Sequence, residues 1–251
     1  MEYIIIFLLG LCVGSFLNVV ADRITTKKSI FVGRSECSFC HKELIWFELI
    51  PLVSFLIQGR KCRNCHKELS WEYFLSELAL GVLFIATYAR FSMYSLYLLV
   101  AYFVISFSLA GIYLVDSKKR IIPIPFLCMI LLSCIIIILD SPTLFIPNLL
   151  SGIGAGIFFF LIFALTKGRG MGFGDVLYSF VAGLLLGFPG TIFGLYFAFL
   201  TGAITSLILI LGKKKRLRGD TVPFGPFLVI GTLIMVFFGH IISPFILSLL
   251  F

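Results

Sequence analysis

The sequence predicts an all-α polytopic membrane protein with about eight transmembrane helices and a cytoplasmic four-cysteine zinc-binding loop after the first helix. Two observations carry the membrane prediction. Of the 251 residues, 60% are hydrophobic and only 13% are charged, and apolar runs long enough to cross a hydrocarbon layer of about 30 Å recur along the chain. A soluble domain of this length would need far more polar surface to cover its core.

Eight apolar runs are candidates for membrane spans, and the sixth is the shortest. The first, "EYIIIFLLGLCVGSFLNVV", has no basic stretch before it and no small-residue cleavage site after it. We therefore interpret it as a span and not as a cleavable signal. The predicted spans are Tyr3–Val20, Tyr73–Ala89, Ser92–Val115, Pro123–Leu139, Pro147–Thr166, Val176–Gly187, Thr191–Leu211 and Gly225–Leu250.

The basic residues are distributed unevenly over the loops between these spans. If the spans alternate in direction, one set of loops carries 19 of the 20 Lys and Arg residues, and only Arg90 falls on the other side. By the positive-inside rule the crowded side is cytoplasmic, so both termini are predicted to lie outside. Positive charge spread over every inner loop argues against nucleic-acid binding and favours attraction to anionic lipid as a secondary effect.

The spans divide the chain into three predicted parts. Residues 1–20 form the first transmembrane helix, and residues 73–251 form a seven-helix transmembrane domain. Between them, residues 21–72 are the one sizeable polar segment and form a cytoplasmic domain with paired Cys-x-x-Cys motifs.

The polar segment contains "CSFC" and "CRNC", and each continues with the same letters, "CHKEL". Two such pairs can supply four thiolates in a tetrahedron, which suits Zn²⁺ in a closed site that folds the loop and does no chemistry. Two disulfides, disfavoured in a reducing cytoplasm, or four free thiols are the alternatives, and His41 or His66 could replace one ligand. The predicted ligands are Cys37, Cys40, Cys62 and Cys65.

Two acidic residues, Asp116 and Asp175, lie at the predicted inner ends of spans. Asp116 ends the third span before "SKKR", and Asp175 follows "GRGMGFG" at the start of the sixth, so both are expected at the same depth on the same face. An ionisable group at membrane depth is costly unless it faces a partner or a wet cavity, which favours a functional role. Taken singly, Asp175 is also explained as a helix cap and Asp116 as a salt-bridged or snorkelling residue.

The glycines before Asp175 indicate a loop that another backbone can approach. Gly170, Gly172 and Gly174 remove side chains, which allows tight turns and close contact with a peptide substrate. Two neighbouring carboxylates share a proton near neutral pH, so one can activate a water while the other protonates a leaving amine. Helix polarity predicts Asp175, at a helix N-terminus, as the initial base and Asp116, at a C-terminus, as the initial acid.

Six motifs, in order, resemble the type IV prepilin peptidase / N-methyltransferase family of bacterial membrane aspartic proteases of the Gly-x-Gly-Asp class. They are "GSFLNVVADR", the paired-cysteine loop, "CRNCHKELSWEYFLSE", "VDSKKRIIP", "GMGFGD" and "TVPFGPFLVIG", which together cover nearly the whole chain. The resemblance implies that Asp116 and Asp175 are the catalytic pair within a peptidase domain of residues 73–251. Leu177, Ile124 and Glu48 depart from residues common in the family, near the expected substrate and methyl-donor surface.

The resemblance also implies what the protein acts on. It implies cleavage of the basic leader of type IV prepilins or pseudopilins after glycine, at the cytoplasmic face of the bacterial inner membrane. It further implies N-methylation of the new N-terminus with S-adenosylmethionine, although no Gly-rich nucleotide-binding fingerprint locates a donor site. A preflagellin-type peptidase without methyltransferase activity is one alternative, which the four-cysteine loop disfavours. An ion or metal transporter with the two aspartates as ligands is another, but the sequence shows no inverted repeat.

Overall fold

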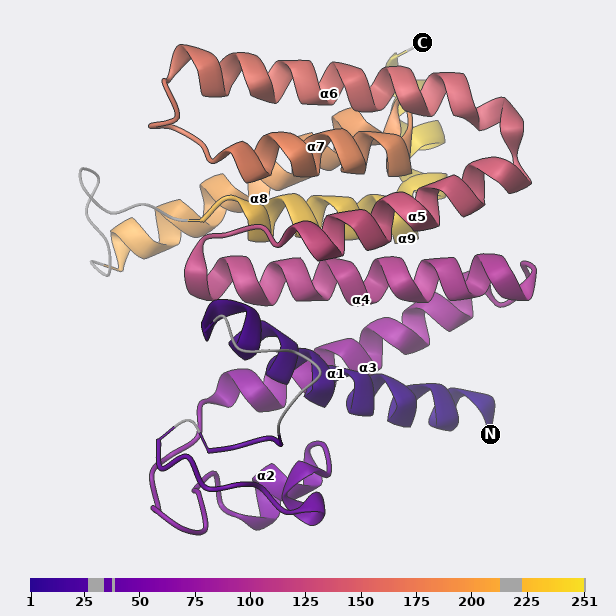
Figure 1. The fold of residues 1–251 in the computed structure, drawn as a ribbon. Coiled ribbons are helices and arrows are strands. Elements are labelled where there is room, and N and C mark those ends of the chain that lie inside the picture. Colours follow the sequence, from indigo (N-terminus) through magenta and orange to yellow (C-terminus); the bar gives the residue numbers. More distant parts are fainter. Residues whose placement is uncertain (27–33, 38, 213–222, 251) are drawn as a thin grey trace. The chain divides into compact units, whose positions relative to one another are not determined.

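The computed structural model describes residues 1–26, 34–37, 39–212 and 223–250 of the chain. Regular structure in these residues is helical, and their β-structure is limited to two isolated bridges (Figure 1). The helices are α1 (Glu2–Thr26), η1 (Trp46–Leu49), α2 (Val53–Ile57), α3 (Trp71–Phe91), α4 (Leu96–Lys119), α5 (Ile124–Asp140), η2 (Pro142–Leu144), α6 (Phe145–Leu165), α7 (Phe173–Leu186), α8 (Gly190–Leu211) and α9 (Gly225–Leu250).

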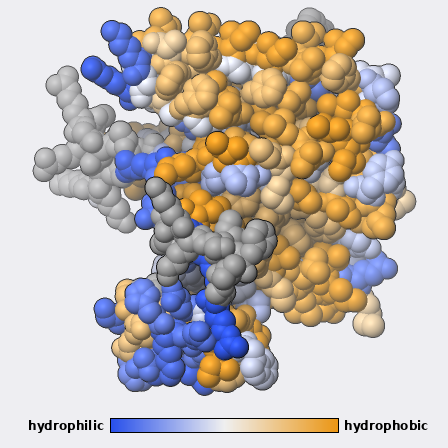
Figure 2. Space-filling view, in the orientation of Figure 1, coloured by the Kyte–Doolittle hydropathy of each residue, from blue (hydrophilic) through white to orange (hydrophobic). Residues whose placement is uncertain are grey.

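Six helical segments of the described chain are long and apolar enough to cross a membrane, and they cover all or most of α1, α3, α4, α6, α8 and α9. The shorter apolar helices α5 and α7 account for the remaining two predicted spans. Figure 2 shows that the helices present a mostly hydrophobic surface, whereas hydrophilic side chains gather over the paired-cysteine loop. Because a helix satisfies its backbone polar groups internally, it suits a span in hydrocarbon. The predicted fold class, an all-α polytopic membrane protein, is confirmed.

The helix ends follow local backbone chemistry rather than hydropathy. α1 continues to Thr26, beyond the predicted end at Val20, because polar residues are compatible with a helix that leaves the membrane. Pro123 is the N-cap of α5, and Pro226 follows the first residue of α9. Proline lacks an amide hydrogen and has a fixed φ, so it suits the first turn of a helix and marks these two starts.

Residues Met1–Phe107 form the first of two compact units, called unit 1. α1 packs on α3 partly through polar groups, since the Ser76 hydroxyl donates to Asn18 Oδ1 at 2.8 Å and Asn18 is buried. The first half of α4 also packs on α3, where the Thr87 and Ser106 hydroxyls lie 2.7 Å apart. Part of the "GSFLNVVADR" motif therefore serves to hold α3.

Residues Ser108–Phe251 form unit 2, in which α6 packs against α7 and α8 against α9. α6 and α7 approach closely, because a Cβ added at Gly183 would lie only 2.6 Å from the Cα of Gly152. Such small-residue contacts promote helix association in lipid, where no hydrophobic force drives it. The buried Tyr178 of α7 donates its hydroxyl to Thr232 of α9 at 2.9 Å. These contacts fix the helices that carry the candidate site.

Candidate functional site

Asp116 lies in the last turn of α4 and is only 4% exposed. The helix ends at the next turn, where the Arg120 amide donates to the Asp116 carbonyl at 2.8 Å and Arg120 adopts a left-handed φ of 58°. Among the described residues, Asp116 Oδ2 has no hydrogen-bond donor. The Gly225 amide acts on the same carboxyl group. A buried polar atom is costly unless it is hydrogen-bonded, so this oxygen would be stabilised by a donor from a water or a substrate group.

The start of α9 lies against Asp116. A Cβ added at Gly225 would be 2.5 Å from Asp116 Oδ2, so a larger residue would collide with the carboxylate. The preceding Phe224 packs at a ring-centroid distance of 5.0 Å on Phe199 of α8 and 6.2 Å on the buried Phe159 of α6. Gly225 and Phe224 were not predicted as site residues. The "PFGP" letters indicate a helix start, but they do not reveal what that start faces.

Asp175 lies in the first turn of α7, whose N-cap is Gly172. The Asp175 carboxylate accepts the Gly172 amide at 3.2 Å, and the Asp175 amide donates to the Gly172 carbonyl at 3.1 Å. Asp175 is therefore not the N-cap itself but the third residue of the helix, and its side chain closes the first turn. One carboxylate oxygen is used in this way, and the side chain is half-buried.

The fold brings Asp116 and Asp175 together within unit 2, although 58 residues lie between them in the sequence. The two side chains are near enough for their charges to interact. The segments that carry them are also in contact, because a Cβ added at Gly174 would lie 3.1 Å from the Cβ of Ile122, which follows α4. Two carboxylates at close range can act as acid and base on one substrate.

The three glycines predicted to shape the loop differ in what they face. Gly174 packs on the chain after α4, and a Cβ at Gly170 would lie 3.1 Å from the Thr166 side chain. At Gly172, which is exposed, the nearest atom would be 3.6 Å away. The left-handed positions of this loop are Lys167, with a φ of 50°, and Gly168, with a φ of 72°. Close packing therefore accounts for Gly170 and Gly174, whereas Gly172 is open to an approaching backbone.

The predicted choice of base and acid depended on Asp116 lying at a helix C-terminus. The structure adds the N-terminus of α9, at Gly225, to the surroundings of Asp116. Both aspartates therefore lie beside helix N-termini, which favour an anion. The helix-end argument no longer distinguishes the two residues. The sequence could not show this, because Gly225 is far from Asp116 along the chain.

The paired-cysteine loop of unit 1 contains two knuckles with matching backbone hydrogen bonds. In each, the amide of the first cysteine, Cys37 or Cys62, donates to the carbonyl five residues later at 3.0 Å. An isolated bridge closes each knuckle. His41 and His66 both have a φ of 55° and occupy the same left-handed turn position. This turn explains the repeated "CHKEL", and neither histidine belongs to the sulfur cluster.

The two knuckles bring four sulfur atoms into one cluster, called the four-cysteine cluster: Cys37, Cys40, Cys62 and Cys65, whose Sγ atoms all lie within 4.8 Å of one another. Two of the Sγ–Sγ distances are 4.0 Å, far above the roughly 2.0 Å of a disulfide. In a tetrahedral site with Zn–S bonds near 2.3 Å, the sulfurs lie about 3.8 Å apart. The donor set therefore fits a metal ion.

Local hydrogen bonds prepare part of this cluster for a cation. The backbone amide of Lys42 lowers the pKa of Cys40 to about 6, and the amide of Cys65 lowers the pKa of Cys62. The Lys67 amide acts in the same direction on Cys65, but burial and the neighbouring sulfurs raise the pKa of that thiol to about 11. The thiolate is the form that binds metal, so cation binding would release the remaining protons.

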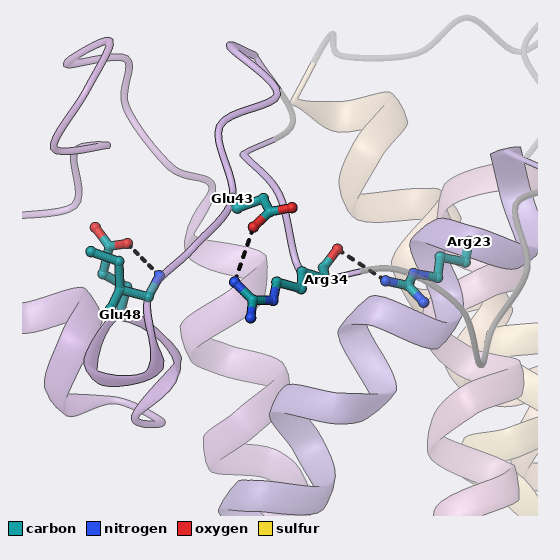
Figure 3. Close-up of polar contacts among 5 residues, drawn as sticks. Arg23, Arg34, Glu43 and Glu48 are labelled. Atoms are coloured by element: carbon teal, nitrogen blue, oxygen red, sulfur yellow. Dashed lines mark hydrogen bonds and ion pairs between the residues drawn. The ribbon is translucent and has the colours of Figure 1, made fainter.

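Polar contacts tie the loop to the end of α1 (Figure 3). Arg23, the last residue of "GSFLNVVADR", donates to the Arg34 carbonyl at 3.1 Å, and the Arg34 guanidinium pairs with Glu43 at 3.2 Å. Glu48 accepts the Ile45 amide at 2.9 Å and closes the turn that begins η1. The contacts of Arg34 with Arg23 and Glu43 link the first knuckle to the end of α1.

Fold and site together define a multi-pass membrane protein with two clustered carboxylates and a four-cysteine cluster. Residues 8–91 match the Bacterial Peptidase A24 N-terminal domain, and residues 102–207 match the Type IV leader peptidase family. The first match contains the four cysteines and the second contains both aspartates.

Curated relatives match along almost the whole chain. The prepilin leader peptidase/N-methyltransferase of Bacillus subtilis (strain 168) is 32% identical over 249 residues, which cover 98% of each chain. Proteins of the same name from Vibrio cholerae and Pseudomonas aeruginosa are 27% and 28% identical over 94% of this chain, and over 98% and 90% of their own. No solved structure matches. The chain belongs to the type IV leader peptidase family.

Proposed function

We propose that the chain is a prepilin leader peptidase that cuts the basic leader from type IV prepilins or pseudopilins after glycine, with Asp116 and Asp175 as its catalytic pair. The observation that carries this proposal is the contact in unit 2 between the segments that bear the two carboxylates, at Gly174 and Ile122, beside the buried Asp116 Oδ2 that makes no hydrogen bond with the described residues. The family match and the names of the relatives support the substrate class.

The proposed reaction is a peptide hydrolysis with two proton transfers. One carboxylate takes a proton from a water whose oxygen attacks the scissile carbonyl carbon, and the other gives a proton to the leaving nitrogen as the C–N bond breaks. The products are a leader with a new carboxylate and a pilin with a free N-terminal amine. The first turns of α7 and α9 lie beside the pair and stabilise whichever carboxylate is ionised.

The exposed Gly172 supports a path for the substrate backbone beside Asp175. A side chain there would lie over the first turn of α7, close to the carboxylate that accepts the Gly172 amide. Gly170 and Gly174 would shape the same loop by packing on the protein itself. A leader peptide ending in glycine would add little bulk of its own, so both backbones could come close.

We propose that the four-cysteine cluster binds one structural Zn²⁺. The support is the fit of the four sulfurs to a tetrahedral site and the lowered pKa of Cys40. A site closed by four thiolates has no open position for a substrate, so the ion would hold the two knuckles together. None of the catalytic steps above involves it.

We also propose that the chain methylates the new N-terminal amine, with S-adenosylmethionine as donor. The support is the name of the relatives, prepilin leader peptidase/N-methyltransferase. An apolar hollow of unit 1, lined by residues that include Phe16, Phe84 and Phe103, has only apolar side chains in its wall. It does not suit a donor with a sulfonium and a carboxylate, because burying unpaired charge is costly. We therefore assign no residue to methyl transfer.

In the bacterial inner membrane, we propose that both termini lie outside and that the aspartates face the cytoplasm, where they meet leader peptides. The support is the concentration of basic residues in one set of loops. A transporter would instead hold a cation between the two carboxylates, and a preflagellin-type peptidase would cleave without methylating.

A cleavage assay with the purified protein and a prepilin from the same organism tests the proposal. Asp116→Asn and Asp175→Asn should each slow cleavage by at least about 10²-fold, whereas Asp140→Asn, at the exposed end of α5, should cut normally. Mass spectrometry of the pilin would report the cut site and an added methyl group separately. If either aspartate variant cleaves at a normal rate, with helical content unchanged, the pair is not catalytic and has a structural or ion-binding role.

A further inference from the structure

The paired-cysteine loop contains an apolar stretch that the loop itself does not bury. The stretch "IWFELIPLVSFLI", Ile45–Ile57, has one charged residue, Glu48. Trp46, Leu56 and Ile57 are 75%, 62% and 72% exposed. Contiguous exposed apolar surface of this kind marks an interaction site in most proteins.

The contacts of α2 show which way this surface faces. α2 has one buried residue, Phe55, whose ring packs at centroid distances of 5.4 Å on Trp71 and 5.5 Å on Phe74, both in α3. Leu56 and Ile57, the next two residues, are exposed. The stretch is thus attached to α3 through Phe55 and presents its other apolar side chains away from that contact.

A hydrogen bond sets the depth at which the stretch is held. The Leu52 amide donates to the buried Glu77 side chain at 2.9 Å, and Glu77 lies six residues into α3, which begins at Trp71. At 1.5 Å per residue, six residues correspond to about 9 Å along the helix. The 21 residues of α3 span about 31 Å at that rise, close to the roughly 30 Å hydrocarbon thickness. Leu52 is therefore held about 9 Å inside the end of α3 that meets the membrane boundary, within the roughly 5–10 Å depth to which interfacial segments are buried.

We propose that Ile45–Ile57 is an interfacial segment that rests in the headgroup region of the bilayer, with Trp46, Leu56 and Ile57 inserted between lipid chains. The occupant of this surface is lipid because the segment packs through Phe55 on a membrane-spanning helix, close to the end of that helix at the membrane boundary. Tryptophan and aliphatic side chains are the residues that favour this region. The inference rests on the membrane placement of α3 and not on the proposed peptidase activity.

The charges of the loop are consistent with insertion through apolar contact. Glu48 is half-buried, and its carboxylate folds back onto the Ile45 amide at 2.9 Å. Between residues 34 and 72, six Lys and Arg residues face five Glu residues, so the described loop has almost no net charge. The segment itself should therefore insert into a neutral membrane without a need for anionic lipid.

The chain offers a direct probe, because its two tryptophans are Trp46 and Trp71. The full-length Trp71→Phe protein, reconstituted into phosphatidylcholine vesicles, has Trp46 as its single reporter. We expect strong quenching of Trp46 by lipids that carry a nitroxide near the headgroup, and a several-fold smaller quenching constant for aqueous iodide than in the urea-unfolded protein. Adding anionic lipid should leave both values unchanged.

A matched control places a tryptophan in the same loop, away from the segment. Phe39→Trp in a Trp46→Phe, Trp71→Phe background reports on the first knuckle, where Phe39 is half exposed, and iodide should quench it readily. If Trp71→Phe disturbs the fold, the Trp46→Phe variant is compared with the unsubstituted protein instead. The lipid quenching that this variant loses is then the contribution of Trp46. The proposal is overturned if iodide quenches Trp46 as readily as it quenches the tryptophan of the Phe39→Trp control. Shielding of Trp46 from both quenchers, or shielding that develops only when prepilin is added, also overturns it, because protein would then cover the segment.

Discussion

The four-cysteine cluster of unit 1 and the carboxylate pair of unit 2 are built in opposite ways. The cluster uses one local motif twice, 25 residues apart, and both copies make the same backbone hydrogen bonds. The pair draws on the end of α4 and the starts of α7 and α9, and its aspartates share no motif. The cluster supplies all four ligands of a tetrahedral site, whereas Asp116 Oδ2 has no hydrogen-bond donor among the described residues.

This difference matches the two roles proposed for them. A metal site that holds a loop together works best when every ligand position is filled by the protein. A site that performs chemistry must leave polar atoms for water and substrate, and the surrounding packing must hold them in place. The rings of Phe224, Phe199 and Phe159 provide such packing beside Asp116.

The largest expected effect concerns the carboxylate pair. Asp116→Asn and Asp175→Asn should each reduce the cleavage rate by at least about 10²-fold, because one of the two proton transfers is lost. The double variant should be no slower than either single variant, since residues that act as a unit are not additive. Initial rates on a purified prepilin measure all three. An independent, multiplicative loss in the double variant would contradict a shared mechanism.

Removing the metal is expected to affect unit 1 rather than the chemistry. Cys62→Ser should abolish the bound zinc and make the loop sensitive to protease, because structural zinc contributes on the order of 10 kcal/mol to the folding of such small sites. Metal analysis and limited proteolysis with mapped cut sites measure both effects. Cys12→Ser, in α1 and outside the cluster, is the control and should retain one zinc per chain. Protease resistance of a metal-free loop would show that the ion does not hold it together.

The close approach of α9 to Asp116 gives a smaller, sharper prediction. Gly225→Ala adds a Cβ that would lie 2.5 Å from Asp116 Oδ2, and a displacement of about 1 Å at a reacting group can cost on the order of 10²-fold in rate. Gly154→Ala, in α6, is the matched control, since a Cβ there has no atom within 4 Å. The cleavage rates of both variants provide the measurement. Equal rates would show that α9 does not position Asp116.

The smallest effect is expected at the attachment of the loop to α3. Glu77→Leu removes the acceptor of the Leu52 amide, and an unsatisfied buried donor costs about 1–3 kcal/mol. The control Glu43→Gln breaks an exposed ion pair with Arg34, which contributes at most about 1 kcal/mol. Iodide quenching of Trp46 and thermal unfolding would compare the two. No difference between them would mean that Glu77 does not hold the segment.

Much of the fold could be predicted because its signals are local. Each of the eight apolar runs in the sequence corresponds to an apolar helix in the structure. The repeated "CHKEL" indicated two equivalent knuckles. The role of the histidine in this motif was less clear, because a histidine next to a cysteine can be either a metal ligand or a turn residue. The left-handed φ of His41 and His66 decides in favour of the turn.

The two aspartates of the candidate site could be predicted from the sequence, but the residues that surround them could not. Asp116 and Asp175 stood out because acids are costly at membrane depth. The nearness of Gly225 could not be inferred, and it removed the reason for assigning Asp116 as the acid. The role of Gly170, Gly172 and Gly174 in shaping the loop stays a prediction, and the structure adds what a Cβ at each of them would contact.

The sequence alone determined the helical spans, the two knuckles and the two candidate carboxylates. Hydrocarbon thickness, turn chemistry and the cost of a buried charge each act on a few neighbouring residues or on one apolar run. Only the tertiary structure decided that α9 begins against Asp116, and that Phe55 and Leu52 attach the apolar segment to α3. Apolarity places a helix in lipid but does not select its neighbours. Those follow from close packing between residues that are distant in the chain.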